Sequence, residues 1–338
     1  MIFNYHIVDK FAETGQVGFV WGADSGLPAG ITNLAYMSSD VVRLPLAWLV
    51  ANHPDWIEYA CDRTTIPYQW VTDNVPVDFE NPAVQVWMLA QAQLRADEGY
   101  SGVGFDNVWL YNGWGRCGHY SLGGQWVQEY SGGLYDASYL GGVLAWADAM
   151  HRGFALITRT GLLSEGHRPT GSQRFLFAIN YGAAPAVSLA AQQQLIASVD
   201  VWLNECSFTG CAGDRSLGTE WATEKRLIDG FTGCYISNNE MRDTSDASLR
   251  QWVIANYLLL NQSCMYLAIE GIQQYGSLLH FPEYDWSVGP ALGPAVLESD
   301  GCWTRRFSNL TVTVDPIHGT ATLVPVSTLL SAASPSPR

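Results

Sequence analysis

The fold is decided by the stretch Gly99-Tyr-Ser-Gly-Val-Gly-Phe-Asp106-Asn-Val-Trp109. A short apolar run ends in a carboxylate and an amide, and a loop rich in aromatic residues follows directly. A buried parallel strand of a barrel delivers an acid to the barrel mouth in this way, because the carboxyl ends of its strands face the mouth. The run Val199-Asp-Val-Trp-Leu-Asn-Glu205 has the same form. We therefore expect Asp106 and Glu205 at the ends of two separate strands.

Apolar runs rich in β-formers alternate with helical patterns along most of the chain, which predicts an α/β fold. Eight segments have the character of strands, the number that a (β/α)8 TIM barrel requires. These segments are residues 2–8, 17–22, 32–37, 102–107, 174–180, 199–205, 234–239 and 263–270.

Two of the intervening helices carry clear start signals. Asn81 followed by Pro82 is typical of a helix N-terminus, and Gly99 is a stop signal. We expect the apolar face of this helix to consist of Ala83, Trp87, Ala90 and Leu94. In the second helix we expect Ser245 as the N-cap, and Leu249, Val253, Tyr257 and Leu260 along one side.

The pattern changes near residue 271. Short alternating runs separated by turn residues predict antiparallel hairpins in the C-terminal part of the chain. The expected organisation is a catalytic (β/α)8 barrel over residues 1–275, a small antiparallel β-sheet over 276–327, and a disordered tail over 328–338.

The chain has 338 residues and a formal charge of −15, from 17 basic and 32 acidic residues. Without a basic cluster, this charge argues against nucleic acid, anionic membrane surfaces and polyanionic substrates, although simple solubility explains it equally well. Aromatic residues are abundant, with 14 Trp and 16 Tyr, and they suit either sugar-ring faces or a large core. No apolar run is long enough to span a bilayer.

Seven cysteines leave at least one without an intrachain partner, and no Cys-x-x-Cys motif occurs. Cys206 and Cys211 flank a short loop directly after Glu205, where a disulfide would fix the loop. For most of the cysteines we expect instead small, buried, apolar side chains.

Two acids at strand ends are the minimum equipment for cleaving a glycosidic bond, in which one carboxylate attacks or activates water and one acid protonates the leaving oxygen. Glu205 follows an apolar strand end and is the better acid, since desolvation raises a carboxyl pKa. Asp106 is then the nucleophile. Either acid alone has a structural explanation, as a helix cap or an arginine partner.

Further polar and aromatic residues lie at other expected strand ends or in long loops, and each could bind a sugar or hold the fold together. The candidates for substrate binding are Asp24, Tyr36, Asp78, Asn107, Trp109, Asn180, Asn204, Glu240 and Glu270. Tyr111 and Trp114 crowd the same loop as Trp109, and Glu283 and Asp285 are secondary acids.

Other chemistries lack their signatures. The seven histidines are scattered without metal-ligand spacing, and no P-loop, Gly-x-Gly-x-x-Gly or Gly-x-Ser-x-Gly motif occurs. We therefore expect no metal and no cofactor.

Several segments, taken in order, resemble a group of glycoside hydrolases with (β/α)8 barrels. These segments are His53-Pro-Asp-Trp56, Val77-Asp78-Phe-Glu-Asn81-Pro82, the strand ending at Asp106-Asn107, Asn204-Glu205 and Phe281-Pro-Glu-Tyr-Asp285. The group is similar to the hypothetical glycosyl hydrolase and endo-α-1,4-polygalactosaminidase-like families, and the likeness runs from about residue 50 to 315. By position it implies Asp106 as nucleophile or base and Glu205 as acid. This chain departs from the group's pattern at Asp55, at Ser101 and at Leu310-Thr311, where the group has Glu, Asp and Gly.

The leading hypothesis is an O-glycoside hydrolase with a retaining mechanism and a carbohydrate substrate, uncharged or cationic rather than a uronic-acid polymer. The alternatives are a carbohydrate-binding protein on the same barrel, a transglycosylase or a lyase. The oligomeric state stays open. Localisation also stays open: a glycan target favours a secreted or periplasmic setting with the leader absent from this chain, whereas residues 1–15 lack the apolar core of a signal peptide.

Overall fold

A computed structural model describes residues 2–3, 18–22, 31–158, 174–262, 264–272, 274 and 279–326. Asp24, the expected tail over 328–338 and residues 4–8 of the first expected strand lie outside this part of the chain. None of the helices within it combines the length and apolar character needed to cross a bilayer.

The main sheet confirms the fold predicted from the sequence. Its eight strands are β1 (Ile2–Phe3), β2 (Phe19–Trp21), β3 (Thr32–Ser38), β7 (Gly102–Asp106), β10 (Leu176–Asn180), β11 (Val201–Asn204), β12 (Cys234–Met241) and β13 (Met265–Gly271). Each falls on one of the eight expected segments. The spatial order β1-β2-β3-β7-β10-β11-β12-β13 follows the chain without reversal. The pairs β2–β3, β3–β7, β7–β10 and β12–β13 are parallel. A parallel sheet wound in one direction is the arrangement of a (β/α) barrel, whereas a doubly wound sheet reverses its order.

In the described residues, six helices and two short 3-10 turns accompany the strands. They are α1 (Leu46–Asn52), η2 (Pro54–Trp56), α2 (Pro82–Asp97), α3 (Ala137–Phe154), α4 (Leu189–Ala197), α5 (Gly218–Gly230), α6 (Ala247–Leu260) and η3 (Pro282–Asp285). Asn81 caps α2 as expected by accepting a hydrogen bond from the backbone N–H of Ala83. The cap of α6 is Asp246 rather than Ser245, because its carboxylate accepts from the backbone N–H groups of Ser248 and Leu249.

The buried face of α2 differs from the expected one. Val84, Met88, Ala92 and Ala96 are buried, whereas the side chain of Leu94 is half exposed. The opposite set, Ala83, Trp87, Ala90 and Leu94, was therefore the wrong choice. Both faces of this helix carry apolar side chains, so their spacing alone does not select the inner one.

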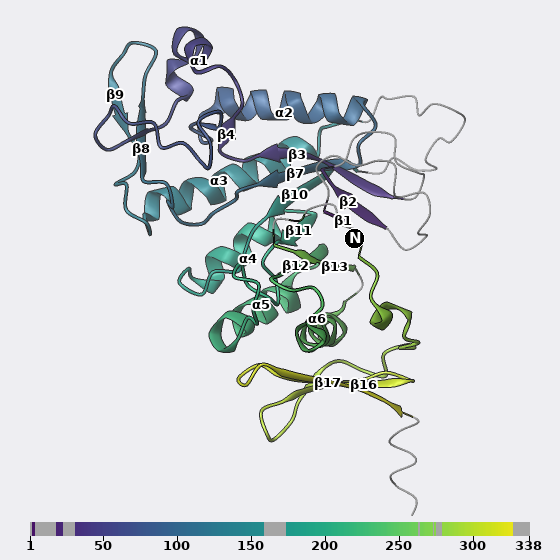
Figure 1. The fold of residues 1–338 in the computed structure, drawn as a ribbon. Helices are drawn as coiled ribbons and strands as arrows, with labels where there is room; N and C mark the ends of the chain where they lie inside the picture. The colour runs from purple at the N-terminus through teal and green to yellow at the C-terminus, as the bar shows by residue number, and fades with distance from the viewer. Residues whose placement is uncertain are drawn as a thin grey trace, which may run out of the picture. The chain divides into compact units, whose positions relative to one another are not determined.

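The chain forms two compact units. The first unit comprises Met1–Asn4, Gly182–Pro185 and Leu203–Arg338, and the second comprises Tyr5–Tyr181 and Ala186–Trp202. In the second unit, α2 packs against β7 and α3, and α3 packs against β10 (Figure 1). This unit also contains an insertion that the sequence did not predict. It has an antiparallel pair, β4 (Val41–Val42) with β6 (Val75–Pro76), and a three-stranded sheet of β5 (Tyr59–Ala60), β8 (Arg116–Tyr120) and β9 (Trp126–Gln128).

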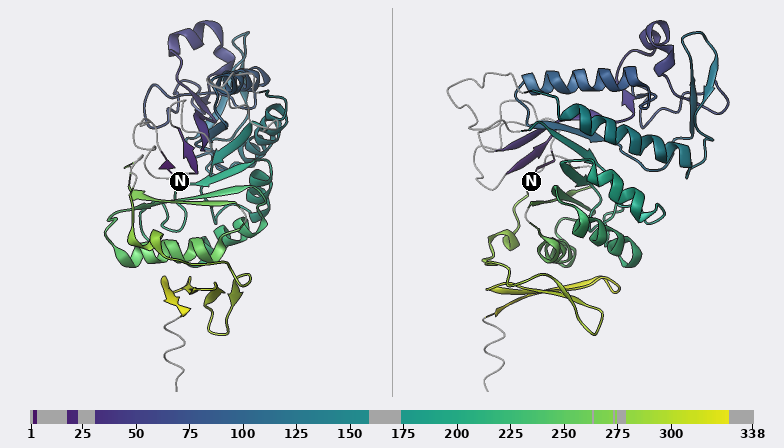
Figure 2. Two further views of the ribbon diagram at one scale, coloured as in Figure 1. Left: turned by 90° about the vertical axis from the view of Figure 1, so that its right-hand side faces the viewer. Right: turned by 180° about the vertical axis from the view of Figure 1, so that it is seen from behind.

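The first unit contains the C-terminal antiparallel sheet that the sequence predicts. Its strands are β14 (Val296–Leu297), β15 (Trp303–Arg306), β16 (Leu310–Asp315) and β17 (Thr320–Pro325), paired in that order. Strands β15, β16 and β17 all pack against α6 (Figure 2). Leu310, Val312 and Val314 alternate with more exposed residues, so one face of β16 is buried. The expected boundary at residue 275/276 stays a prediction.

Three disulfides cross-link the chain: Cys61–Cys117, Cys206–Cys211 and Cys234–Cys264. All seven cysteines lie in the described residues, and Cys302 alone has no disulfide partner. The loop disulfide after Glu205 is thus confirmed, whereas the expectation that most cysteines are simple apolar side chains is wrong.

Candidate active site

Asp106 is the last residue of β7, and its direction follows from the strand's alternation. Side chains two residues apart share a face, so Asp106 lies on the same face as Gly104. A Cβ at Gly104 would lie 2.3 Å from the ring of Trp21, which shows that only glycine fits there. On the other face, Phe105 packs edge-to-face against Trp146 of α3 with ring centroids 5.3 Å apart. The strand is therefore anchored on its helix side and presents Asp106 on the other.

Both carboxylate oxygens of Asp106 are held by donors from neighbouring strands. The Tyr36 hydroxyl on β3 donates to Oδ2 at 2.9 Å, and the Asn180 amide on β10 donates to Oδ1 at 2.9 Å. The backbone N–H of Asn107 also donates to Oδ1, at 2.8 Å. Asp106 is 9% exposed, so most of its surface is covered by these partners. Tyr36, Asn107 and Asn180, three of the predicted substrate-binding residues, thus lie together around Asp106, and their hydrogen bonds orient its carboxylate.

The turn after β7 has an unusual backbone. Asn107 has a φ of 59°, in the left-handed region that asparagine tolerates better than most residues. The Ser39 hydroxyl donates to the Asn107 carbonyl at 3.1 Å, and the Ser39 N–H donates to the Asp106 carbonyl at 3.0 Å. Strained backbone held by surrounding contacts is common at functional sites.

A second acid, Asp40, lies close enough to Asp106 for their charges to interact. It is buried and accepts hydrogen bonds from Arg116, at 2.7 Å, and from Gln69, at 2.5 Å. Burial raises the pKa of Asp40 against the opposing effect of the Arg116 guanidinium. Asp40 was not among the site residues predicted from the sequence. The sequence does place an acid next to a strand end here, because Asp40 comes two residues after the strand Thr32–Ser38, much as Asp106 ends β7.

In the other unit, Glu240 and Glu270 are register partners on β12 and β13. Glu270 accepts a hydrogen bond of 2.7 Å from the amide of Asn238. Burial, reinforced by the charges of Glu240 and Glu205, raises the pKa of Glu270 to about 8. Three of the predicted acids therefore lie near one another, and one of them carries a proton at neutral pH.

Glu205 lies in the turn that follows β11, and this turn is fixed on both sides. The Cys206–Cys211 disulfide closes the loop, and Cys206 forms a β-bridge with Asn239 of β12. The Asn239 side chain also accepts a hydrogen bond from the backbone N–H of Phe208 at 3.0 Å. These contacts hold the backbone next to Glu205.

Asn204, by contrast, serves the interior of this unit. Its side-chain amide donates through Nδ2 to Glu224 of α5 at 3.1 Å, and its side-chain oxygen Oδ1 accepts from the backbone N–H of Cys206 at 3.2 Å. Glu224 is buried and also accepts hydrogen bonds from Ser207 and Tyr235. Neighbouring side chains along a strand point to opposite faces. The amide of Asn204 can therefore point toward Glu224 although Asn204 is next to Glu205 in the sequence.

Two other predicted residues, Trp109 and Asp78, make contacts of a different kind. Trp109 packs edge-to-face on Tyr111 with ring centroids 5.0 Å apart. Asp78 follows β6 in the insertion and accepts from the backbone N–H groups of Glu80 and Asn81, at 2.9 and 3.1 Å. It therefore orders the turn before α2.

No protein-family model matches this chain, and no curated protein matches it. Comparison with solved structures finds Ega3 of Aspergillus fumigatus in complex with galactosamine, at 11% identity and a TM-score of 0.42, covering 81% of this chain and 91% of that one. It also finds the glycoside hydrolase domain of PelA from Pseudomonas aeruginosa, at 12% identity and a TM-score of 0.48, covering 81% and 95%. At these TM-scores the likeness carries no weight for function.

Proposed function

We propose that this protein hydrolyses O-glycosidic bonds of an oligo- or polysaccharide, with Asp106 as nucleophile and Glu205 as general acid. The observation that carries the proposal is the setting of Asp106. It is a strand-end carboxylate whose two oxygens are held by Tyr36 and Asn180 from the strands on either side. A nucleophile fixed in this way needs little reorganisation when it attacks.

The proposed reaction has two steps and retains the anomeric configuration. In the first step a carboxylate oxygen of Asp106 attacks the anomeric carbon while Glu205 gives its proton to the leaving oxygen, and the sugar becomes an ester of Asp106. In the second step the ionised Glu205 takes a proton from water, whose oxygen attacks the same carbon and releases Asp106. Two inversions at one carbon give net retention.

Glu270 supports the acid half of this scheme. Its carboxyl, with a pKa of about 8, is largely protonated at neutral pH, and it interacts with the charge of Glu205. Glu270 is also the second candidate for the proton donor.

Isosteric amide variants test the assignment. We expect Asp106→Asn and Glu205→Gln each to lower kcat by about 10²–10⁴-fold in a reducing-sugar assay over a panel of neutral and amino-sugar glycans. The matched controls Asp148→Asn and Glu298→Gln, which change exposed acids, should leave kcat within twofold of wild type. Retained turnover in either amide variant would rule out its catalytic role.

The roles of the two acids can be separated by the leaving group. Glu205→Gln should lose much less activity on aryl glycosides with good leaving groups, which need no protonation, than on natural glycans. If Glu270→Gln shows that selectivity instead, Glu270 is the proton donor. Product anomers followed by NMR test retention, and wild-type protein that binds glycans without releasing product would be a carbohydrate-binding protein.

A further inference from the structure

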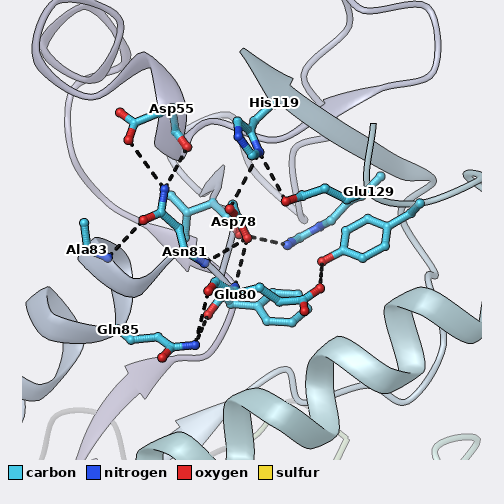
Figure 3. Close-up of polar contacts among 12 residues, drawn as sticks. Asp55, Asp78, Glu80, Asn81, Ala83, Gln85, His119 and Glu129 are labelled. Carbon is cyan, nitrogen blue, oxygen red and sulfur yellow. Dashed lines mark hydrogen bonds and ion pairs between the residues drawn. The ribbon is translucent and has the colours of Figure 1, made fainter. Parts of the chain in front are cut away.

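A second cluster of ionisable groups lies in the insertion of the Tyr5–Tyr181 unit. Glu58 lies between η2 and β5, His119 lies on β8, and Glu129 follows β9. One potential ligand atom from each of the three lies within 4.8 Å of those of the other two. Asp78 borders the cluster, with its Oδ2 3.6 Å from His119 Nδ1, and Glu129 Oε1 lies 3.4 Å from the same nitrogen. Figure 3 shows His119, Asp78 and Glu129 directed toward one another.

Glu58 is the unusual member of this cluster. Its side chain is 0% exposed, and no donor reaches either carboxylate oxygen, whereas the carboxylate of Glu129 lies within hydrogen-bond range. Glu129 Oε2 is buried and unpartnered in the same way. Burying a carboxylate without a partner is costly, and two that face each other repel. Burial, followed by the charge of Glu129, raises the pKa of Glu58 well above its usual range. A proton or a cation between the two carboxylates would offset this repulsion.

The nearest guanidinium does not supply that charge through a hydrogen bond. Arg116 donates through Nη2 to Asp40, at 2.7 Å, and through Nη1 to the Val77 carbonyl, at 3.4 Å. The charge of Arg116 acts on Glu58, but within the described residues His119 is the cationic group that lies directly beside Asp78 and Glu129. Three carboxylates and one imidazole form a donor set that a divalent ion would balance better than a single proton does.

The three ligand residues are braced against one another. The Cys61–Cys117 disulfide ties the residue after β5 to β8, two positions before His119. The N–H of Glu129 donates to the Cys117 carbonyl at 2.9 Å, and the N–H of Glu58 donates to the Pro76 carbonyl at 3.0 Å. Prearranged ligands lose little freedom on binding an ion. With metal–ligand bonds of about 2.0–2.2 Å, closing around an ion requires shifts of roughly an ångström or less.

We propose that Glu58, His119 and Glu129, with Asp78 beside them, bind one divalent transition-metal ion of the Zn²⁺ type. Imidazole and carboxylate donors together suit Zn²⁺ and, less tightly, Mn²⁺, whereas Mg²⁺ and Ca²⁺ prefer oxygen donors alone. The ion is structural: it joins the sheet β5-β8-β9 to the turn before α2. This site is independent of the proposed hydrolase activity, and its test needs no substrate.

The test is calorimetric titration of EDTA-treated, dialysed protein with ZnCl₂ at pH 7.5, with MnCl₂, MgCl₂ and CaCl₂ as comparisons. We expect one Zn²⁺ per chain, weaker Mn²⁺ binding, and a Tm that rises by about 3 °C or more at saturating Zn²⁺. Glu58→Gln should weaken Zn²⁺ binding by at least about 30-fold. Glu80→Gln is the matched control, because Glu80 lies in the same region and bonds to Tyr130 at 2.6 Å without belonging to the three.

The proposal fails if wild-type protein binds neither Zn²⁺ nor Mn²⁺. It fails also if Glu58→Gln binds Zn²⁺ as wild type does. Absence of binding together with a more stable Glu58→Gln variant would show that Glu58 and Glu129 share a proton. Should Glu58→Gln not fold, zinc-edge X-ray absorption on the wild-type complex decides the matter. One imidazole with oxygen ligands is expected, and a shell of sulfur or of several imidazoles would contradict the site.

Discussion

Individual hydrogen bonds determine how Asp106 is presented, and Tyr36 provides the simplest one to remove. Tyr36→Phe deletes the donor 2.9 Å from Oδ2 and keeps the ring. A hydrogen bond to a charged group contributes about 1.5–3 kcal/mol, so we expect kcat/KM to fall by roughly 10–100-fold with little change in Tm. The control is Tyr135→Phe, because Tyr135 is 63% exposed. An unchanged kcat/KM would show that this donor does not serve the reaction.

Glu224 links stability to pH through burial. Desolvation raises its folded-state pKa to about 7 from an ordinary value of 4.5, so the folded protein binds its proton more tightly than the unfolded chain does. The stabilisation from this group is complete below pH 4.5 and is lost as pH rises through about 7, a total of about 3 kcal/mol.

Glu224→Gln removes this titration and keeps an acceptor for Asn204, Ser207 and Tyr235. Relative to wild type, its free energy of unfolding in urea should therefore improve progressively between pH 4.5 and 7.5. Glu220→Gln, on the exposed first turn of the same helix, should show no such trend. A difference between wild type and Glu224→Gln that does not depend on pH would contradict the linkage.

Some features of individual residues could be predicted from the sequence and others could not, for physical reasons. The pattern of an apolar run ending in an acid correctly placed Asp106 at the end of β7, and the same pattern applied to Thr32–Ser38 would have singled out Asp40. The same pattern did not predict that the side-chain amide of Asn204 donates a hydrogen bond to Glu224. No sequence pattern pointed to the cluster of Glu58, His119 and Glu129. The three residues come from separate segments of an irregular insertion, so they are not arranged at a spacing typical of metal ligands.

At the scale of elements, the disulfides cross-link loops of very different lengths. Cys61–Cys117 joins residues 56 apart in sequence, and Cys206–Cys211 joins residues 5 apart. In the chain-entropy account, removing the first should cost about 4 kcal/mol and removing the second about 2 kcal/mol. Paired Cys→Ser variants compared by urea unfolding test this order, with Cys302→Ser as the control for an unpaired thiol. Equal losses, or the reverse order, would contradict it.

Helices and strands were predictable to different degrees. Several strands of the main sheet, such as β7, β10 and β11, are largely apolar runs bounded by turn residues, and all eight strands fall on the segments expected from the sequence. Helix α2 has apolar side chains on both faces, so its cap was predictable and its inner face was not. The strands of the insertion, β4, β5, β6, β8 and β9, are only two to five residues long, too short to show a clear periodicity. Their segments are linked by contacts between residues distant in sequence, such as the Cys61–Cys117 disulfide and the buried ion pair of Arg116 with Asp40.

For the whole molecule, the charge of −15 should act on substrates at long range. Acidic proteins attract cationic ligands and repel anionic ones, and salt screens both effects.

If the chain is the hydrolase we propose, kcat/KM for an amino-sugar oligomer should fall about 10-fold between roughly 20 and 200 mM NaCl. The N-acetylated oligomer of the same length and linkage is the matched neutral substrate, and its kcat/KM should stay within about twofold over that range, because an uncharged ligand gains nothing from the field. Measuring both on one preparation separates steering from any effect of salt on the enzyme. Equal salt dependence for the two substrates would mean that the acidic surface serves solubility alone.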